Sequence, residues 1–182
     1  GVVGIGSKQD FFTGKRENGA LMKTLKNYLS LIKFAHTIFA MPFALIGYML
    51  GIKIFNFQFS IFNFSLVLLC MIFARSAAMA FNRYLDRTFD AKNPRTAIRE
   101  IPKGIISANK ALIFTIVSCA LFLVACFFIN KLCFYLAPVA LFVVLGYSYT
   151  KRFTPLCHLI LGLGLSLAPI GAYLAVTGKF DL

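Results

Sequence analysis

The stretch ALIFTIVSCALFLVACFFIN, residues 111–130, decides the fold because its twenty consecutive residues carry no charge. A helix needs about 20 apolar residues to cross a hydrocarbon layer of about 30 Å. The stretch lacks the alternation of apolar and polar residues that marks a half-buried strand, and it is far longer than a strand. It therefore predicts a transmembrane helix.

Four further windows of similar or greater length are free of charge, at residues 34–52, 54–74, 132–150 and 153–178. The whole chain of 182 residues is 59% hydrophobic and 14% charged, whereas soluble domains average about 45–50% and about 25%. This composition excludes a disordered chain and disfavours an ordinary soluble domain. We predict an all-α, multi-spanning transmembrane bundle with five membrane spans.

The 19 lysines and arginines are distributed unevenly around these windows. With successive connections on opposite sides of the membrane, fifteen of these cations lie on one side, in segments 1–33, 83–110 and 151–152, and three lie on the other. The positive-inside rule then places the N-terminus and the 83–110 connection in the cytoplasm. We expect an integral protein of the bacterial inner membrane, and we disfavour nucleic-acid binding because the charge follows membrane topology.

The segment before the first span has a helical pattern of its own. Apolar residues recur there at helical spacing, and they are Leu21, Met22, Leu25, Tyr28, Leu29 and Ile32. The pattern predicts an amphipathic helix on the cytoplasmic leaflet. The chain thus divides into a cytoplasmic tail, residues 1–33, and a transmembrane domain, residues 34–178.

The polar segment RSAAMAFNRYLDRTFDAKNPRTAIREIPKGIIS, residues 75–107, holds the candidate chemistry. Asn82, Asp86 and Asp90 are spaced by four and share one face of a helix that continues out of the second span. Arg75 lies on nearly the same face, and a charge within a span is costly and usually functional. The helix is expected to end just before Pro94, because the residue preceding a proline is driven out of helical geometry.

Like charges four residues apart destabilise a helix by roughly 0.2–0.5 kcal/mol, and a divalent cation would reverse that penalty. Mg²⁺ prefers carboxylate and amide oxygens and commonly shares them with substrate phosphates. A rim of cations that suits phosphate oxygens surrounds the stripe, namely Arg83, Arg87, Lys92, Arg95, Arg99 and Lys103. We predict a Mg²⁺ site for a lipid-borne diphosphate; the alternative is a solvated loop whose arginines only set topology.

The pattern N-x-x-x-D-x-x-x-D, followed by NPRT and a further R-x-x-x-x-G-x-I-S, closely resembles the first aspartate-rich motif of the UbiA-type membrane prenyltransferases. Among these it resembles most the 4-hydroxybenzoate polyprenyltransferases and their menaquinone-pathway relatives. The pieces HTIFAMPFALIG (residues 36–47) and YSYTKRFTPL (residues 147–156) resemble the first span and the fourth connection of the same family.

The resemblance implies a bundle of about nine spans with a cavity open to the membrane. It implies that Asn82, Asp86 and Asp90 hold Mg²⁺ against a polyprenyl diphosphate. Arg87 and the pair Lys151–Arg152 match the family's diphosphate-binding positions, and we add Arg75 as a further candidate. The implied reaction transfers the polyprenyl group to a small aromatic acceptor resembling 4-hydroxybenzoate, in ubiquinone or menaquinone biosynthesis.

The chain departs from the family pattern at two positions. Arg83 stands where an aspartate is common, and Glu100 stands where a proline is common. The family's second aspartate-rich motif does not occur in the 182 residues, so we expect an N-terminal fragment that is inactive alone. Alternatives are the haem-farnesylating branch of the superfamily and, from another class, a transporter or a non-catalytic membrane subunit.

Overall fold

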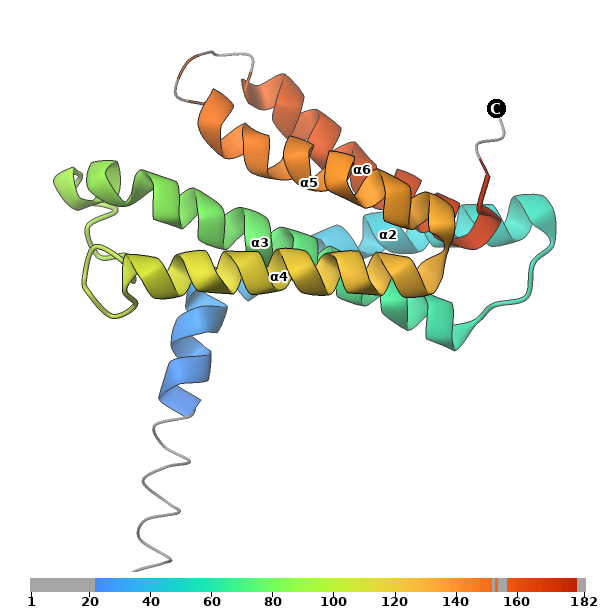
Figure 1. The fold of residues 1–182 in the computed structure, drawn as a ribbon, viewed down its shortest axis with the longest axis horizontal. Coiled ribbons are helices and arrows are strands. Elements are labelled where there is room, and N and C mark those ends of the chain that lie inside the picture. The colour runs from blue at the N-terminus through green and yellow to red at the C-terminus, as the bar shows by residue number, and fades with distance from the viewer. Residues whose placement is uncertain (1–21, 152, 154–156, 180–182) are drawn as a thin grey trace, which may run out of the picture.

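The computed structural model describes residues 22–151, 153 and 157–179. Figure 1 shows a short helix at residues 22–31 followed by a bundle of longer helices. These are α2 (Phe34–Phe55), α3 (Ile61–Lys92), α4 (Ala108–Ile129), α5 (Lys131–Thr150) and α6 (Cys157–Thr177). The described residues contain no strand. The predicted all-α bundle is confirmed. Four charge-free windows each fall on one helix, whereas the window at residues 54–74 includes the end of α2 and the 56–60 connection, and α3 begins only at Ile61.

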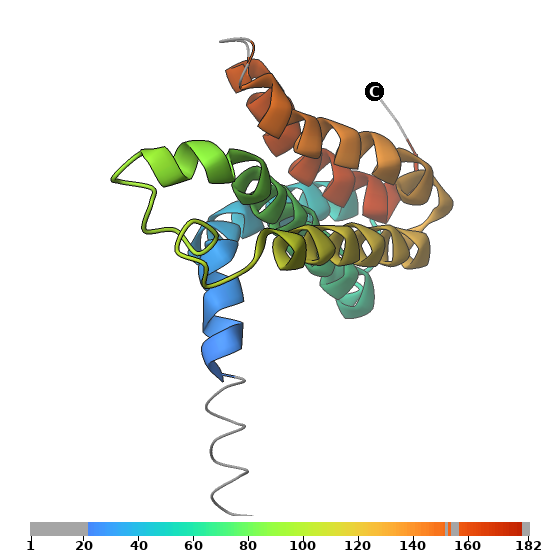
Figure 2. The same ribbon diagram turned by 60° about the vertical axis from the view of Figure 1, so that its left-hand side comes forward.

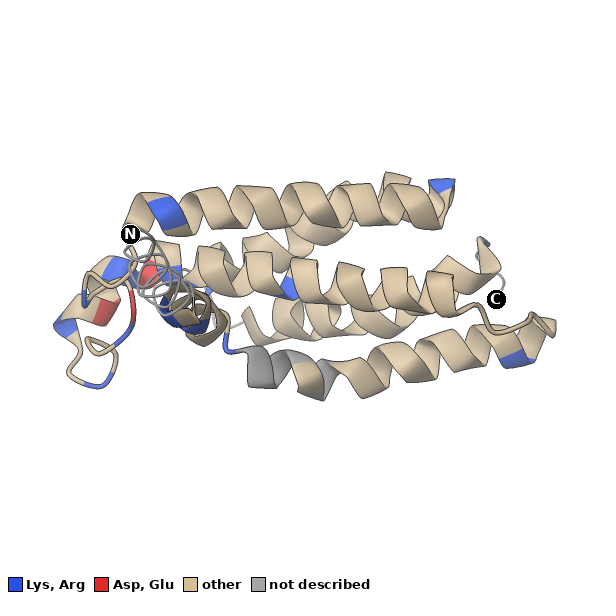
Figure 3. Ribbon diagram, turned by 90° about the horizontal axis from the view of Figure 1, so that it is seen from below, with Lys and Arg blue, Asp and Glu red and all other residues tan. Residues whose placement is uncertain are grey.

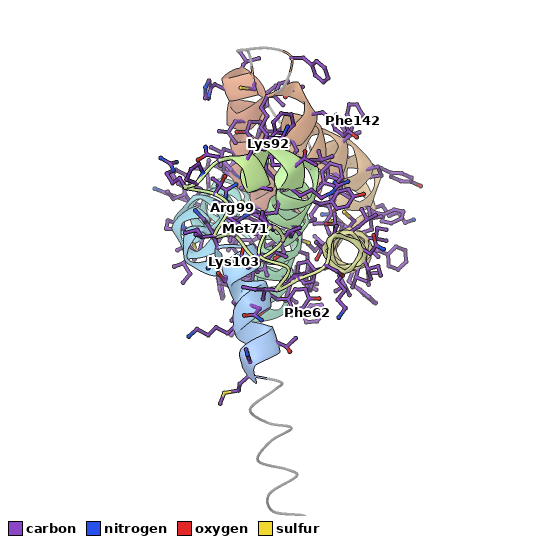
Figure 4. All side chains as sticks on the ribbon, turned by 90° about the vertical axis from the view of Figure 1, so that its left-hand side faces the viewer. Phe62, Met71, Lys92, Arg99, Lys103 and Phe142 are labelled. Carbon is purple, nitrogen blue, oxygen red and sulfur yellow. The ribbon has the colours of Figure 1, made fainter. Side chains whose placement is uncertain are left out.

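Helices α3, α4, α5 and α6 are each long and apolar enough to cross a membrane. Helix α2 has 22 residues, and its segment Met41–Phe55 is apolar. Large apolar side chains point away from the bundle; Phe142 on α5, for example, is 79% exposed and projects outward in Figure 4. An outer surface of this kind suits helices surrounded by lipid.

The helices pack in neighbouring pairs, α3 against α4 and α2 against α6, and α5 contacts both α4 and α6 (Figures 1 and 2). Small side chains dominate the buried core, which includes Ala44, Ala125, Ala137, Ala172 and Cys126. In lipid, association of helices depends on close van der Waals packing, which small residues allow.

Asn130 makes the sharp turn between α4 and α5 at one end of the bundle. Its side-chain oxygen accepts a hydrogen bond from the backbone N–H of Cys133 (2.7 Å), which caps the start of α5. Its amide nitrogen donates to the carbonyl of Leu174 on α6 (2.9 Å). One side chain therefore joins three helices at this end.

Helix α3 is longer than a membrane requires. Its 32 residues make it about 48 Å long, against a hydrocarbon layer of about 30 Å. It ends at Lys92, with Asn93 in extended geometry (φ −102°, ψ 120°) before Pro94, as predicted. Residues 82–92 thus lie beyond the span, together with the 93–107 loop and the adjoining ends of α4 and α5. We call this region the polar end; Figure 3 shows charged residues gathered there.

The helix at residues 22–31 projects from the side of the bundle, roughly perpendicular to the long helices (Figures 1 and 2). Its last turn is anchored because Leu31 is fully buried in a small apolar cluster with Ala80, Ile106 and Ala111. The ring of Tyr28 packs against that of Phe114, with centroids 5.2 Å apart. The predicted helix is present, and Leu21, the first residue of its apolar pattern, lies outside the described residues.

Gly47 on α2 permits the close packing of α2 against α6. A Cβ atom at Gly47 would collide with the backbone of Pro169, whereas one at Gly162 would meet nothing within 4 Å. We expect Gly47→Ala to destabilise the protein by about 1–3 kcal/mol, the usual cost of overpacking. Thermal unfolding in detergent measures the effect, with Gly162→Ala as control. Equal unfolding temperatures for the two variants would contradict the α2–α6 contact.

Candidate functional site

At the polar end, Asn82 and Asp86 point to the same cation. They are one helical turn apart on α3, so their side chains project to one side. Nζ of Lys151, the residue that ends α5, donates to Oδ1 of Asn82 (3.2 Å) and forms an ion pair with Oδ2 of Asp86. The side chains of Asp86 and Lys151 are 14% and 25% exposed. The structure thus joins the motif on α3 to the fourth connection, 65 residues further along the chain.

Asp90, the third member of the predicted stripe, has a different partner. Its carboxylate accepts two hydrogen bonds from NH1 of Arg99, at 2.8 and 2.7 Å, and the residue is 6% exposed. The backbone carbonyl of Asp90 also accepts from the hydroxyl of Thr96 (3.0 Å). Asp90 therefore fixes the start of the 93–107 loop to the end of α3 and does not share a cation with Asn82 and Asp86.

A second ion pair attaches the 93–107 loop to α3 through Glu100, the residue after Arg99. NH1 of Arg83 lies 3.2 Å from Oε2 of Glu100, and the side chains are 7% and 14% exposed. The hydroxyl of Ser30, at the end of the helix at residues 22–31, donates to the other oxygen of Glu100. The rim of free cations that the sequence suggested is therefore smaller than expected, because Arg83 and Arg99 are engaged by carboxylates.

Arg87 and Arg75, the other diphosphate candidates among the described residues, have different surroundings from Lys151. The guanidinium of Arg87 stacks on the ring of Tyr84 (4.4 Å) and donates to the carbonyl of the same residue (2.7 Å). Arg75 lies inside the membrane-spanning part of α3, where its Nε is buried without a hydrogen-bond partner among the described residues. Oγ of Ser148 on α5 is buried in the same unsatisfied state. Arg152 lies outside the described residues.

The donor set fits a divalent cation at Asn82 and Asp86. An amide oxygen and a carboxylate oxygen converge on one positively charged atom, which here is the ammonium nitrogen of Lys151. Among the described residues, no three His, Cys, Asp or Glu side chains gather into a metal site. Mg²⁺ is commonly bound by one or two carboxylates and completed by water and substrate phosphates, a pattern that the carboxylate of Asp86 matches, with the amide oxygen of Asn82 beside it.

The sequence motifs did not predict that Ser30 and Glu100 contact each other at the polar end. Glu100 is one of six acidic residues in the chain, and in a region so rich in cations its partner was bound to be basic. The small number of acidic residues indicated that Glu100 pairs with a cation, but spacing along the chain could not show that this cation is Arg83.

A sequence profile described as the UbiA prenyltransferase family matches residues 40–182. The chain belongs to this family. The match includes α3, the 93–107 loop and Lys151. The family assignment from the aspartate-rich motif is therefore confirmed, and the protein is an integral membrane protein.

Curated relatives include two kinds of enzyme. The protoheme IX farnesyltransferase of Cronobacter sakazakii is 34% identical over 160 residues, 86% of this chain and 53% of the relative. The 4-hydroxybenzoate octaprenyltransferase of Tolumonas auensis is 34% identical over 123 residues, 66% of this chain and 43% of the relative. The chain spans about half the length of these relatives.

Solved structures share the fold. A UbiA homologue from Aeropyrum pernix K1, in its apo form, has a TM-score of 0.73 and 32% identity, covering 79% of this chain and 51% of that one. A UbiA homologue from Archaeoglobus fulgidus, solved bound to GPP and Mg²⁺, has a TM-score of 0.67 at 24% identity, covering 85% and 55%. The latter likeness shows the common helical architecture.

Lys151 and a divalent cation would compete for the same two oxygens. We expect Lys151→Met to tighten Mn²⁺ binding by about threefold to tenfold, because a tenfold change needs only about 1.4 kcal/mol. Electron paramagnetic resonance of free Mn²⁺ measures the affinity without any turnover. Lys131→Met, at the opposite end of α5, provides the matched control and should leave the affinity unchanged. Weaker or unaltered Mn²⁺ binding in Lys151→Met would contradict the competition.

Proposed function

We propose that the protein transfers a polyprenyl group from its diphosphate to a small aromatic acceptor resembling 4-hydroxybenzoate, in quinone biosynthesis. The observation that carries this proposal is the convergence of Asn82, Asp86 and Lys151 at the polar end of a membrane bundle. An anionic headgroup can bind at such a point while its hydrocarbon tail stays among the apolar helices. Membership of a prenyltransferase family supports the same substrate class.

Asn82 and Asp86 hold Mg²⁺ in this proposal, and Asp90 supports the site from the next turn of α3. When bound, Mg²⁺ supplies positive charge that stabilises the negative charge growing on the leaving diphosphate. Lys151 leaves the carboxylate of Asp86 and donates to a diphosphate oxygen. Arg87 and Arg152 are further donors to the diphosphate in this proposal, and Arg75 adds positive charge within the span of α3.

The reaction breaks the bond between the terminal prenyl carbon and the diphosphate oxygen. The electron pair leaves with the diphosphate, the allylic cation is attacked by an electron-rich ring carbon, and the ring then loses its proton. The chain contributes 21 Phe and 7 Tyr residues, from which an apolar cavity can exclude water from the cation. The site residues thus bind and orient the leaving group, while the bundle protects the electrophile.

Two acceptors are consistent with the relatives. The matches to 4-hydroxybenzoate octaprenyltransferases favour an aromatic acid. The match to a protoheme IX farnesyltransferase covers more of the chain, 86%, and favours haem as the second candidate. These acceptors differ so much in size that separate assays with each of them distinguish the two candidates.

We also propose that the polar end faces the cytoplasm. Seven lysines and arginines lie in residues 83–110, whereas single lysines lie at the opposite connections, and positive charge is retained on the cytoplasmic side. The helix at residues 22–31 projects from the bundle roughly perpendicular to the long helices and exposes Met22 and Leu25, as expected of a helix lying on the leaflet. The bacterial inner membrane provides this setting.

Asn82→Ala tests the site against a matched control, Asn63→Ala, near the other end of the same helix. Full-length protein in membranes receives Mg²⁺ and a polyprenyl diphosphate, with 4-hydroxybenzoate in one assay and haem in another. We expect Asn82→Ala to lower prenyl transfer by about 100-fold or more, because a lost ligand removes charge stabilisation from the transition state. Asn63→Ala should retain activity.

Two results would contradict the proposal. Undiminished activity of Asn82→Ala would contradict the role of Asn82 in binding metal and diphosphate, but it would not contradict prenyl transfer itself. Absence of product with either acceptor in the wild-type protein would favour a transporter or a non-catalytic subunit. Product from haem alone would identify the second candidate as correct.

A further inference from the structure

The junction of α3, the 93–107 loop and the helix at residues 22–31 contains an ion pair that the proposed reaction does not use. Arg83 is 6% exposed, and its partner Glu100 receives a further hydrogen bond from Ser30. Taking two charges out of water costs several kcal/mol per ion, and their attraction often does no more than offset that cost. A pair of this kind therefore requires an explanation other than net stability.

The position of the pair along α3 supplies one. Arg83 and Asp90 are seven residues apart and so lie on nearly the same face, two turns apart. Adjacent loop residues hold them, Glu100 at Arg83 and Arg99 at Asp90. The two ion pairs thus fasten the loop to α3 on either side of Asp86 along the helix.

Asn82 and Asp86 lie about 100° and about 60° around α3 from Arg83, and both contact Lys151, the residue that follows α5. Fixing the Arg83 face against the loop therefore fixes the rotation of α3 about its own axis. That rotation determines whether the oxygens of Asn82 and Asp86 point together at the diphosphate position. The buried cluster of Leu31, Ala80, Ile106 and Ala111 also joins the helix at residues 22–31, α3, the 93–107 loop and α4 through apolar contacts.

We propose that Arg83 and Glu100 are positioning residues, which hold the 93–107 loop and α3 so that Asn82 and Asp86 face the metal and diphosphate together. The inference rests on the proposed function of Asn82 and Asp86. It also relates the two departures from the family pattern to each other, because the arginine at 83 and the glutamate at 100 form one contact. An aspartate at position 83 would instead repel Glu100.

Limited trypsin digestion and Mn²⁺ binding test the proposal on the full-length protein without turnover. Lys103 is exposed in the loop (Figure 4) and provides the cleavage site. We expect Arg83→Gln and Glu100→Gln each to speed cleavage after Lys103 by about tenfold, as expected when the loop loses one attachment. Each should also weaken Mn²⁺ binding by roughly threefold to tenfold, within the range found when a supporting partner of a metal ligand is lost.

Two comparisons make the result decisive. Lys110→Gln removes an exposed cation from the first turn of α4, outside the predicted rim, and should change neither quantity. The exchanged pair, Arg83→Glu with Glu100→Arg, should recover most of the slow cleavage and of the Mn²⁺ affinity. Glu100→Gln nearly preserves the shape of the side chain, so it keeps the test interpretable if the exchanged pair fails to fold.

A loop that opens in Glu100→Gln while Mn²⁺ affinity stays at the wild-type value would overturn the positioning role, because the pair would then be structural only. Equal cleavage rates in all variants would overturn the attachment itself. Failure of prenyl transfer in the wild-type protein contradicts the proposed function but leaves both of these readouts intact. The two proposals therefore fail separately.

Discussion

The length of α3 is the constraint on which the rest of the structure depends. At about 48 Å, its 32 residues exceed the hydrocarbon layer, so its last turns must leave the membrane. Polar side chains carry little desolvation cost outside the hydrocarbon layer, and Asn82, Asp86 and Asp90 lie on that extension of α3. Lys151, after α5, and Arg99, in the 93–107 loop, supply partners to these side chains. Ser30, in the helix at residues 22–31, contacts Glu100 of the same loop.

Those partners divide the acidic residues between two tasks. Asp90 and Glu100 bind arginines and determine where the loop lies. Asp86, with Asn82, faces the ammonium group of Lys151, which a metal ion replaces in the proposed function. In that proposal the two arginine ion pairs preserve the geometry while the cation between Asn82 and Asp86 changes.

Much of this arrangement follows from the sequence, because charge-free length predicts spans and a spacing of four places residues on one helical face. Charge-free length predicts the five long helices, and Pro94 predicts the end of α3 just before it. Periodicity gives a face but not the partner of that face, so the binding of Asp90 by Arg99 could not be predicted. The contact of Glu100 with Ser30, 70 positions away, depends on tertiary packing that no local pattern encodes.

In the proposed function, Asn82 and Asp86 exchange Lys151 for a metal ion when a diphosphate binds. Anomalous scattering from Mn²⁺ in crystals of the full-length protein with a non-hydrolysable prenyl diphosphate analogue would locate the metal. We expect a Mn²⁺ peak at coordination distance from both side-chain oxygens, with Nζ of Lys151 on the diphosphate. A Mn²⁺ peak elsewhere, with Lys151 still paired to Asp86, would contradict it.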